Sequence, residues 1–562
     1  MKLKTIINTA LLVGMVGCAD LDLNPLSEGS SEAWYSNATE VEMSVNDLFR
    51  SVFWQGYEDS WTDDFTNREA LTPITNATIN GEWGTLNTLW ANTYKVIARS
   101  NTLLLNMDKI QGTVPQATID TYTGNAHFVR AAKYGELVFL FGDVIHSTTI
   151  LSLEEAFTMG RTDKNTVKEA VYEDFDIAAS LLPESYGSSE NKLATKGAAY
   201  AMKARFALQM GDFAIARDAA KACMDLGVHE LYPDYGELFL TGTRNPSEVI
   251  FAMPRSRSLN VTWSVRNYLP RNVGGWGGAF APSWDLLHAY LCTDGLPIDE
   301  SPLYDPRNPF ENRDPRCAAT IVPFQSRHLN FTYQPHPDST EVMNFNTGSY
   351  QTNNDTRSVA AFASFNGLLR KKGVDEDWLL NYQAENDEIL MRYADVLLMY
   401  AEAKIELGEI DGSVHEAMNS VRARAYGVAV EQVTEYPAIT SSDQAELRTI
   451  LRTERRMEFG FEGVRYSDII RWKIAEKVLN RDVYGMLDVA ELKEKVIDQD
   501  LWFFPMTPEI DEDGVADLSP MYEAGLVKRL AIRQFEAPKQ YLWPIPSKEI
   551  LINSNLEQNP GY

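Results

Sequence analysis

Two stretches of helical periodicity, separated by a long segment without it, constrain the fold of this chain more than any other feature. In residues 85–107 apolar side chains recur three or four positions apart, as they do on one face of a helix. The same spacing predicts further helices at 118–141, 167–182, 196–210, 213–226, 391–407, 414–425, 444–461 and 467–479. The chain is therefore expected to be mainly α-helical, with helical blocks at about 85–226 and 387–480.

Tight turns favour antiparallel helical pairs in both blocks. A Gly-Asp turn at 211–212 joins two predicted helices, and the small residues Ala204 and Ala216 would let that pair approach closely. Gly408 has the same position in the second block. The arrangement resembles a tetratricopeptide repeat with an irregular period. A helical bundle without repeats is the alternative.

The segment between the blocks, about 228–385, has a different composition. Glycine, proline, asparagine and aromatic residues dominate it, as in PRNVGGWGG at 270–278. Only short strands are expected there, such as one at 248–253. Irregular segments of this length in compact proteins are usually functional. We expect this segment to form a loop-rich ligand-binding region within a single domain at 32–562.

The N-terminus has the pattern of a bacterial lipoprotein signal. Lys2 and Lys4 precede a short apolar run that ends in MVGC, which is similar to a lipobox. Residues 1–17 are predicted to be the signal peptide, Cys18 the lipidated residue, and 18–31 a polar tether. An acyl chain contributes roughly 0.8 kcal/mol per buried methylene, so more than one chain gives a durable anchor. An ordinary cleaved signal with an incidental cysteine is the alternative.

Charge and cysteine usage exclude several classes of partner. The formal net charge of −28 repels phosphate backbones, so no nucleic-acid partner is expected. Apart from Cys18, the three cysteines Cys223, Cys292 and Cys317 cannot all pair, and their spacing fits no zinc or redox motif. We expect mostly buried thiols. The seven histidines are scattered, and neither a metal site nor a cofactor is predicted.

Four motifs resemble the SusD/RagB family. The strongest is the C-terminal segment 542–562, LWPIPSKEILINSNLEQNPGY. The others are TERRMEFGFEGVRYSDIIRW at 453–472, MRYADVLLMYAEA at 391–403 and FVRAAKYGELVFLFGD at 128–143. They follow one another in the order of the family over nearly the whole mature chain.

These motifs are rich in arginines and carboxylates on predicted helices. The arginines are Arg130, Arg392, Arg455, Arg465 and Arg471, and the carboxylates are Glu402, Glu454, Glu458 and Asp468. Guanidinium forks pair with carboxylates bidentately, so we expect polar locks where helices cross. A catalytic role would need a nucleophile motif, metal-ligand pair or phosphate loop, and none accompanies these residues. The chain is predicted not to be an enzyme.

The resemblance implies a role at the cell surface. SusD-like proteins are lipid-anchored on the outer face of an outer membrane, where they cap a SusC-like TonB-dependent transporter. They bind oligosaccharides on an irregular face carried by tetratricopeptide-like helical pairs. This chain is expected to capture oligosaccharide or polysaccharide and deliver it to such a transporter. The RagB-type branch handles peptides, so a peptide-binding lid is the alternative. A surface glycoside hydrolase and a lid without its own ligand are the other possibilities.

Sugars offer an apolar ring face and a rim of hydroxyls, which suit aromatic platforms beside polar side chains. The candidates for glycan binding are Trp83, Trp276, Tyr268, Asp64, Arg68 and Arg370. Relatives often place a binding tryptophan near Trp83, and the region of Asp64 and Arg68 borders the site in the family. Packing against a helix, a surface ion pair and solvated surface are the competing interpretations of these residues.

Overall fold

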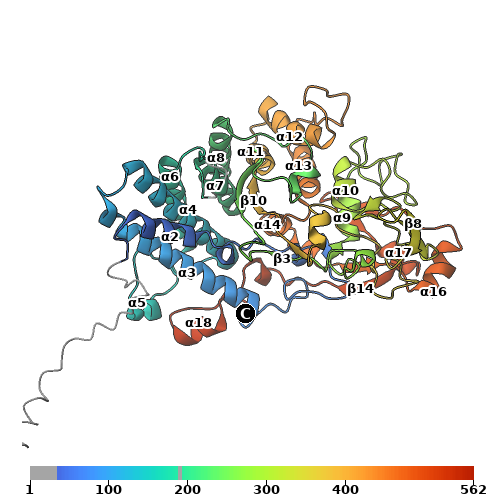
Figure 1. The fold of residues 1–562 in the computed structure, drawn as a ribbon, viewed down its shortest axis with the longest axis horizontal. Helices are drawn as coiled ribbons and strands as arrows, with labels where there is room; N and C mark the ends of the chain where they lie inside the picture. Colours follow the sequence, from blue (N-terminus) through green and yellow to red (C-terminus); the bar gives the residue numbers. More distant parts are fainter. Residues whose placement is uncertain (1–33, 188–192) are drawn as a thin grey trace, which may run out of the picture.

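The computed structural model describes residues 34–187 and 193–562. The predicted signal peptide, Cys18 and the tether lie outside this part. Helices gather at one end of the molecule, and loops with short strands form the other (Figure 1). Within the described residues, no helix combines the length and apolar character needed to span a bilayer. The predicted mainly helical fold is confirmed.

The helices of the first block pack in sequence order. Their bounds are α2 Ala38–Leu48, α3 Gly84–Asn106, α4 Gln116–Phe141, α5 Leu153–Thr158, α6 Lys164–Leu181, α7 Lys196–Met210 and α8 Phe213–Asp225. α3 packs on α4, α4 on α6, α6 on α7 and α7 on α8. The five helices predicted for this block are confirmed, with ends displaced by no more than a few residues.

The bounds of α7 follow from its capping residues. The Thr195 hydroxyl accepts a hydrogen bond from the Ala198 N–H at 3.2 Å, which satisfies an otherwise free amide at the start of the helix. At the other end Gly211 has φ +78°, a left-handed conformation that favours glycine. Gly408, with φ +72°, ends α11 (Tyr393–Leu407) in the same way. The two predicted tight turns are therefore confirmed.

The second block differs from the prediction in one place. Its helices are α11, α12 Gly412–Ala425, α13 Gln444–Phe459, α14 Arg465–Arg471 and α15 Ala475–Val478. The prediction of one helix over 467–479 is wrong: the left-handed Lys473, with φ +59°, separates α14 from α15. α13 packs against α11, and α11 packs against α8, which joins the two blocks.

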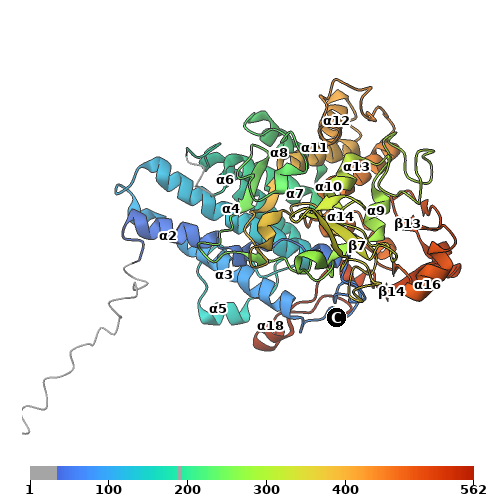
Figure 2. The same cartoon turned by 45° about the vertical axis from the view of Figure 1, so that its right-hand side comes forward.

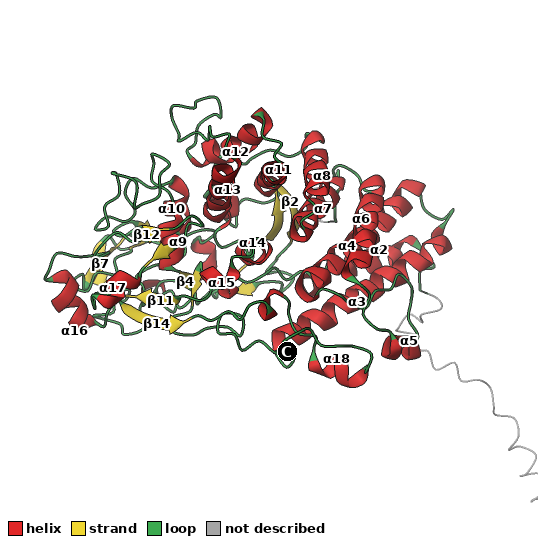
Figure 3. Ribbon diagram, turned by 180° about the vertical axis from the view of Figure 1, so that it is seen from behind, coloured by secondary structure: helices red, strands yellow, loops and turns green. Residues whose placement is uncertain are grey.

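Short antiparallel strands shape the remainder of the chain. β2 (Val249–Met253) confirms the strand predicted at 248–253, and it pairs with β10 (Glu388–Arg392) between the helical and loop-rich ends (Figure 3). The four-stranded sheet is β5 Arg327–His328, β6 Phe331–Thr332, β7 Glu341–Asn344 and β8 Ser349–Thr352. The other pairs are β1 Phe65–Thr66 with β4 Ala281–Pro282, β3 Trp263–Ser264 with β9 Gln383–Ala384, β11 Asp482–Gly485 with β14 Lys528–Ile532, and β12 Glu509–Ile510 with β13 Ala516–Asp517.

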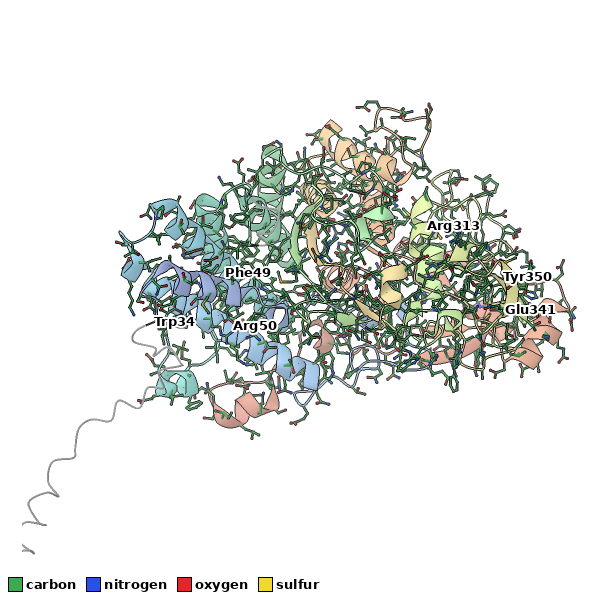
Figure 4. The ribbon with its side chains drawn as sticks, viewed as in Figure 1. Trp34, Phe49, Arg50, Arg313, Glu341 and Tyr350 are labelled. Carbon is green, nitrogen blue, oxygen red and sulfur yellow. The ribbon has the colours of Figure 1, made fainter. Side chains whose placement is uncertain are left out.

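Short helices and helical turns lie between the longer elements and after the last strand. They are η1 Ser51–Phe53, η2 Asp59–Trp61, η3 Met107–Ile110, η4 Glu237–Phe239, α9 Trp284–Ala289, η5 Arg271–Val273, α10 Pro315–Thr320, η6 Glu376–Leu379, α16 Val489–Leu492, η7 Lys493–Ile497, α17 Ser519–Glu523, η8 Lys539–Tyr541 and α18 Ser547–Ile552. The β7–β8 hairpin, with Glu341 and Tyr350, lies at the end of the molecule opposite Trp34 (Figure 4).

The C-terminal motif has a structural explanation. Its segment ends below α3, with α18 beside α5 (Figure 2). The Asn559 amide donates to the carbonyls of Phe141 at 2.9 Å and Trp543 at 2.7 Å. The Asn553 amide donates to the carbonyl of Met159 at 2.8 Å. These side chains satisfy backbone groups at the ends of α4 and α5, and they hold the C-terminal segment against the first helical block.

A buried ion-pair network confirms the predicted polar locks. Glu458 on α13 is 0% exposed. It lies 2.6 Å from Arg392 and 2.9 Å from Arg316, and it also pairs with Arg424. Arg316 belongs to α10 and Arg424 to α12, so one carboxylate joins the second helical block to the loop-rich part. Burial alone would raise the pKa of Glu458, but the three guanidinium groups hold that pKa well below its usual range.

Three more of the predicted arginines form locks of the same kind, whereas Arg465 pairs with Asp63 in a loop at 2.9 Å. Arg455 pairs with Asp468 at 2.9 Å and with Asp395 at 2.8 Å. Arg471 pairs with Glu402 and with Asp468. Arg130, on α4, pairs with Asp174 on α6 at 2.7 Å. Bidentate pairs of this kind fix the angle and register at which helices cross. The expectation of buried thiols is confirmed for Cys223, Cys292 and Cys317.

Candidate functional site

A cavity of about 1030 Å³ lies between the helical block and the loop-rich part. One wall comes from α4 and α7, and includes Glu136 and Arg205. The opposite wall comes from β2, β3 and the segments around Tyr268, Arg370 and Phe461. The volume suits a ligand of several sugar rings or a short peptide, since pockets for small molecules occupy roughly 300–1000 Å³.

Aromatic rings form the loop-rich wall. Tyr268 makes edge contacts with Trp263 at 5.6 Å and Phe280 at 5.4 Å between ring centroids. Trp263 in turn contacts the buried Trp378 at 5.0 Å. Each ring is held by its neighbours, and Tyr268, Trp263 and Phe280 are all only partly buried. They offer rigid apolar surface to the cavity, as stacking on a sugar ring requires.

Polar side chains lie beside these rings. Arg255 stacks over Trp263, with its guanidinium carbon 5.3 Å from the ring centroid, and pairs with Glu388 at 2.5 Å. The Trp263 indole N–H donates to the Asn386 amide oxygen at 3.3 Å. Charged groups and amides next to apolar rings can bind the hydroxyl rim of a saccharide while a ring covers its face.

Asp59 is the carboxylate of the cavity lining with the most altered titration. Burial raises its pKa to about 7, and the nearby charge of Asp64 adds to this shift, while the Arg370 guanidinium opposes it. The Gly463 N–H donates to Asp59 at 3.3 Å. At neutral pH this side chain is therefore divided between a hydrogen-bond acceptor and a protonated donor.

The ion-pair network positions Arg370 in this wall. Lys372, two residues further on, is buried and pairs with Glu462 at 2.5 Å. Glu462 also pairs with Arg392 at 2.7 Å, which connects it to Glu458. The Arg370 Nε donates to the Lys372 carbonyl at 2.9 Å. Lys372 is thus part of the interior, and only Arg370 among 370–372 lines the cavity.

Three of the six predicted site residues line the cavity. They are Tyr268, Arg370 and Arg68. The Arg68 guanidinium is used by the protein, since it donates to the carbonyls of Trp276 at 2.5 Å and Phe362 at 2.9 Å. That Tyr268, Arg370 and Arg68 bind a ligand remains a prediction.

The other three lie elsewhere. Asp64 is corrected to a structural residue: it is 2% exposed, and its carboxylate accepts two hydrogen bonds from Arg456, at 2.6 and 2.8 Å. Trp83 is partly buried, and its ring contacts Trp543 at 5.2 Å outside the cavity lining. Trp276 is 49% exposed on the loop surface and also lies outside the cavity lining. Trp276 remains a separate exposed ring.

Several cavity residues were not among the predicted ones. They are Asp59, Trp263, Phe280, Arg255, Asn386 and Phe461. Trp263 lies in the same loop as the predicted Tyr268, and Phe461 lies inside the 453–472 motif. Asp59 and Asp64 are both aspartates and lie five positions apart. The sequence holds no signal that tells which one faces the cavity.

The raised pKa of Asp59 predicts a pH-dependent stability. A folded-state pKa of about 7, against roughly 3.9 when unfolded, means that stability is lost as the pH rises through 7. Asp59→Asn removes the cost of ionisation. Its free energy of unfolding relative to wild type should therefore rise by roughly 2 kcal/mol between pH 5 and pH 8.

Urea unfolding at the two pH values measures this difference. The groups that face Asp59 are Arg370, Asp64, Lys372 and the Gly463 N–H. Glu58→Gln, at the exposed neighbouring carboxylate, is the control and should show the same shift from wild type at both pH values. An equal shift for Asp59→Asn at both pH values would contradict the assignment.

Comparison with known proteins gives two family-model matches. Residues 247–562 match the model described as "SusD family". Residues 21–208 match a model described as "Starch-binding associating with outer membrane". Together they cover most of both helical blocks and of the loop-rich part.

Individual relatives cover most of the chain. SusD-like protein P2 of Formosa agariphila is 25% identical over 100% of both chains. A SusD-like protein of Bacteroides ovatus is 24% identical over 85% of this chain and 84% of its own. The crystal structure of a SusD-like carbohydrate-binding protein from Bacteroides fragilis has a TM-score of 0.76 at 26% identity, covering 93% of this chain and 99% of its own. A laminarin-binding SusD-like protein shares the fold with a TM-score of 0.58 at 20% identity, covering 94% and 100%.

Proposed function

Because the chain belongs to the SusD family, we propose that it captures oligosaccharide or polysaccharide in the cavity between its helical and loop-rich parts. The observation that carries this proposal is the wall of Tyr268, Trp263 and Phe280 beside Asp59 and Arg370. Rings of this kind stack on the C–H face of a sugar, and the polar groups bind its hydroxyls. Relatives described as carbohydrate-binding and laminarin-binding support a saccharide as the ligand.

We further propose a lipid-anchored position on the cell surface. The lipobox-like MVGC ending at Cys18 and the family description of outer-membrane association support it. In this position the protein would present captured glycan to a SusC-like TonB-dependent transporter. Delivery to the transporter follows from the family resemblance and is part of the proposal.

A non-catalytic role is the third part of the proposal. The carboxylates of the helical motifs are bound to arginines: Glu454 and Glu458 are both 0% exposed. Glu454 pairs with Arg316 and Arg422, each at 2.7 Å. A carboxylate held in this way is not free to act as an acid or a nucleophile at a glycosidic bond. This supports binding rather than hydrolysis by these motifs.

Isothermal titration against a panel of polysaccharides and their oligosaccharides tests the function. We expect saturable binding to at least one glycan, with no release of reducing sugar from the glycan that binds. A casein hydrolysate is the parallel arm for the peptide alternative. Binding to the hydrolysate with silence toward every glycan would overturn the proposal, and release of reducing sugar would show a glycoside hydrolase.

A further inference from the structure

Most arginines that line the cavity pair with a carboxylate, and Arg370 differs from them. Arg205 pairs with Asp395 at 2.6 Å, and Arg255 pairs with Glu388 at 2.5 Å. Arg533 pairs with Asp285 at 3.1 Å. Over residues 34–187 and 193–562, by contrast, no Asp or Glu oxygen lies within 4.0 Å of a nitrogen of Arg370.

Aromatic rings take the place of that carboxylate. The guanidinium carbon of Arg370 lies between 5.0 and 5.8 Å from the centroids of four rings. These rings belong to Trp263, Tyr268, Trp378 and Phe461. A ring face attracts the positive charge but supplies no lone pair to the N–H groups. Such a cage holds the guanidinium in place and leaves most of its hydrogen-bonding capacity unused.

The backbone on both sides of Arg370 is fixed. Val322 donates to the Leu369 carbonyl at 3.0 Å, and Lys371 donates to the Thr320 carbonyl at 2.8 Å. The Arg370 Nε donates to the Lys372 carbonyl at 2.9 Å. Over the described residues its Nη–H groups donate to no carbonyl or carboxylate, and the Arg370 side chain lines the cavity. They form a preorganised donor fork.

The surrounding charge is only partly balanced. Glu462 is committed to Arg392 and Lys372, and Asp59 is partly protonated at neutral pH. Burial also lowers the pKa of Arg370, although Tyr268, Asp59 and Glu462 nearby partly oppose this shift. Burying a guanidinium without a dedicated counter-charge is unfavourable, and a bound anion would offset that cost.

We infer that Arg370 binds the carboxylate of an acidic sugar, so that the cavity prefers uronate-containing glycans to neutral ones. A planar carboxylate accepts two parallel N–H bonds from a guanidinium fork, which a sugar hydroxyl cannot do. The rings of Tyr268 and Trp263 lie beside the fork, where they can cover the face of the same sugar ring. This inference rests on the proposed glycan-binding function.

Titration calorimetry with matched glycans tests the preference. The probes are polygalacturonate, alginate and hyaluronan oligosaccharides, each beside its carboxyl-reduced neutral form, together with the neutral panel described above. We expect at least one acidic oligosaccharide to bind tenfold or more tightly than its reduced counterpart. A neutral glycan bound as well as or better than every acidic one would overturn the inference and leave the proposed function standing. Silence toward every glycan would overturn both.

Variants then assign the preference to Arg370. Arg370→Gln should abolish the difference between the acidic and the reduced oligosaccharide. Arg370→Lys, which keeps the charge and loses the fork, should restore only part of it. Arg266→Gln is the control, because Arg266 lies in the same loop region over Trp276 and outside the cavity lining. A preference that survives Arg370→Gln in a protein with unchanged thermal unfolding would contradict the assignment.

Discussion

Glu458→Ala is expected to lower the free energy of unfolding by about 3–5 kcal/mol, because it leaves three buried guanidinium groups without their shared carboxylate. Arg316, Arg392 and Arg424 are between 0% and 7% exposed, so water cannot replace the lost partner. Glu458→Ala should also weaken ligand binding, because the same network positions Lys372 and, through it, Arg370. Urea unfolding followed by circular dichroism measures the stability.

A surface ion pair provides the matched control for this prediction. Glu409 pairs with Arg217 at 2.6 Å, and its side chain is 43% exposed. Glu409→Ala should change the free energy of unfolding by less than about 1 kcal/mol, since exposed pairs contribute little. Similar losses for the Glu458 and Glu409 variants would show that the buried network does not determine the stability of the fold.

Tyr268→Ala is expected to weaken glycan binding by roughly ten- to a hundredfold, or about 1.4–2.8 kcal/mol. Tyr268 contributes a platform to the cavity, contacts Trp263 and Phe280, and shields one side of Arg370. Its loss removes stacking area and loosens both neighbouring rings. Tyr268→Phe keeps the ring and should recover most of the affinity. Isothermal titration with the glycan found in the panel measures both variants.

Two tryptophans outside the cavity are the controls for Tyr268. Trp276→Ala removes a ring that is 49% exposed and outside the cavity lining. Trp83→Ala removes packing against Trp543 and Trp61, so it should lower stability while the folded protein keeps its affinity. If Trp276→Ala abolished binding and Tyr268→Ala did not, the site would lie on the loop surface instead of in the cavity.

The helical part of this fold was predictable because its determinants are local. The helical spacing of residues, the Thr195 cap and the glycine at 211 together define α7, and its observed bounds are the predicted ones. The prediction of one helix over 467–479 was wrong because no residue near Lys473 indicates a left-handed conformation there. The motif arginines were also correctly interpreted as structural, because arginines and carboxylates on neighbouring helices are suited to buried ion pairs.

The candidate site was less predictable because its walls come from distant segments. Asp59, Tyr268, Arg370 and Phe461 meet only through the packing of loops against α13 and the strands. Asp59 lines the cavity and Asp64 does not, for the same reason: Arg456 of the distant helix α13 pairs with Asp64. The glycines around Trp276 leave its ring exposed, but exposure alone does not place a ring in the cavity.

A crystal structure of the protein soaked with the tightest-binding oligosaccharide of the panel tests the central claim most directly. We predict a sugar ring seated against Tyr268 and Trp263, with its polar groups within hydrogen-bonding distance of Arg370 or Asp59. An ordered oligosaccharide at Trp276 or Trp83, with the cavity between the helical and loop-rich parts free of sugar, would contradict the account.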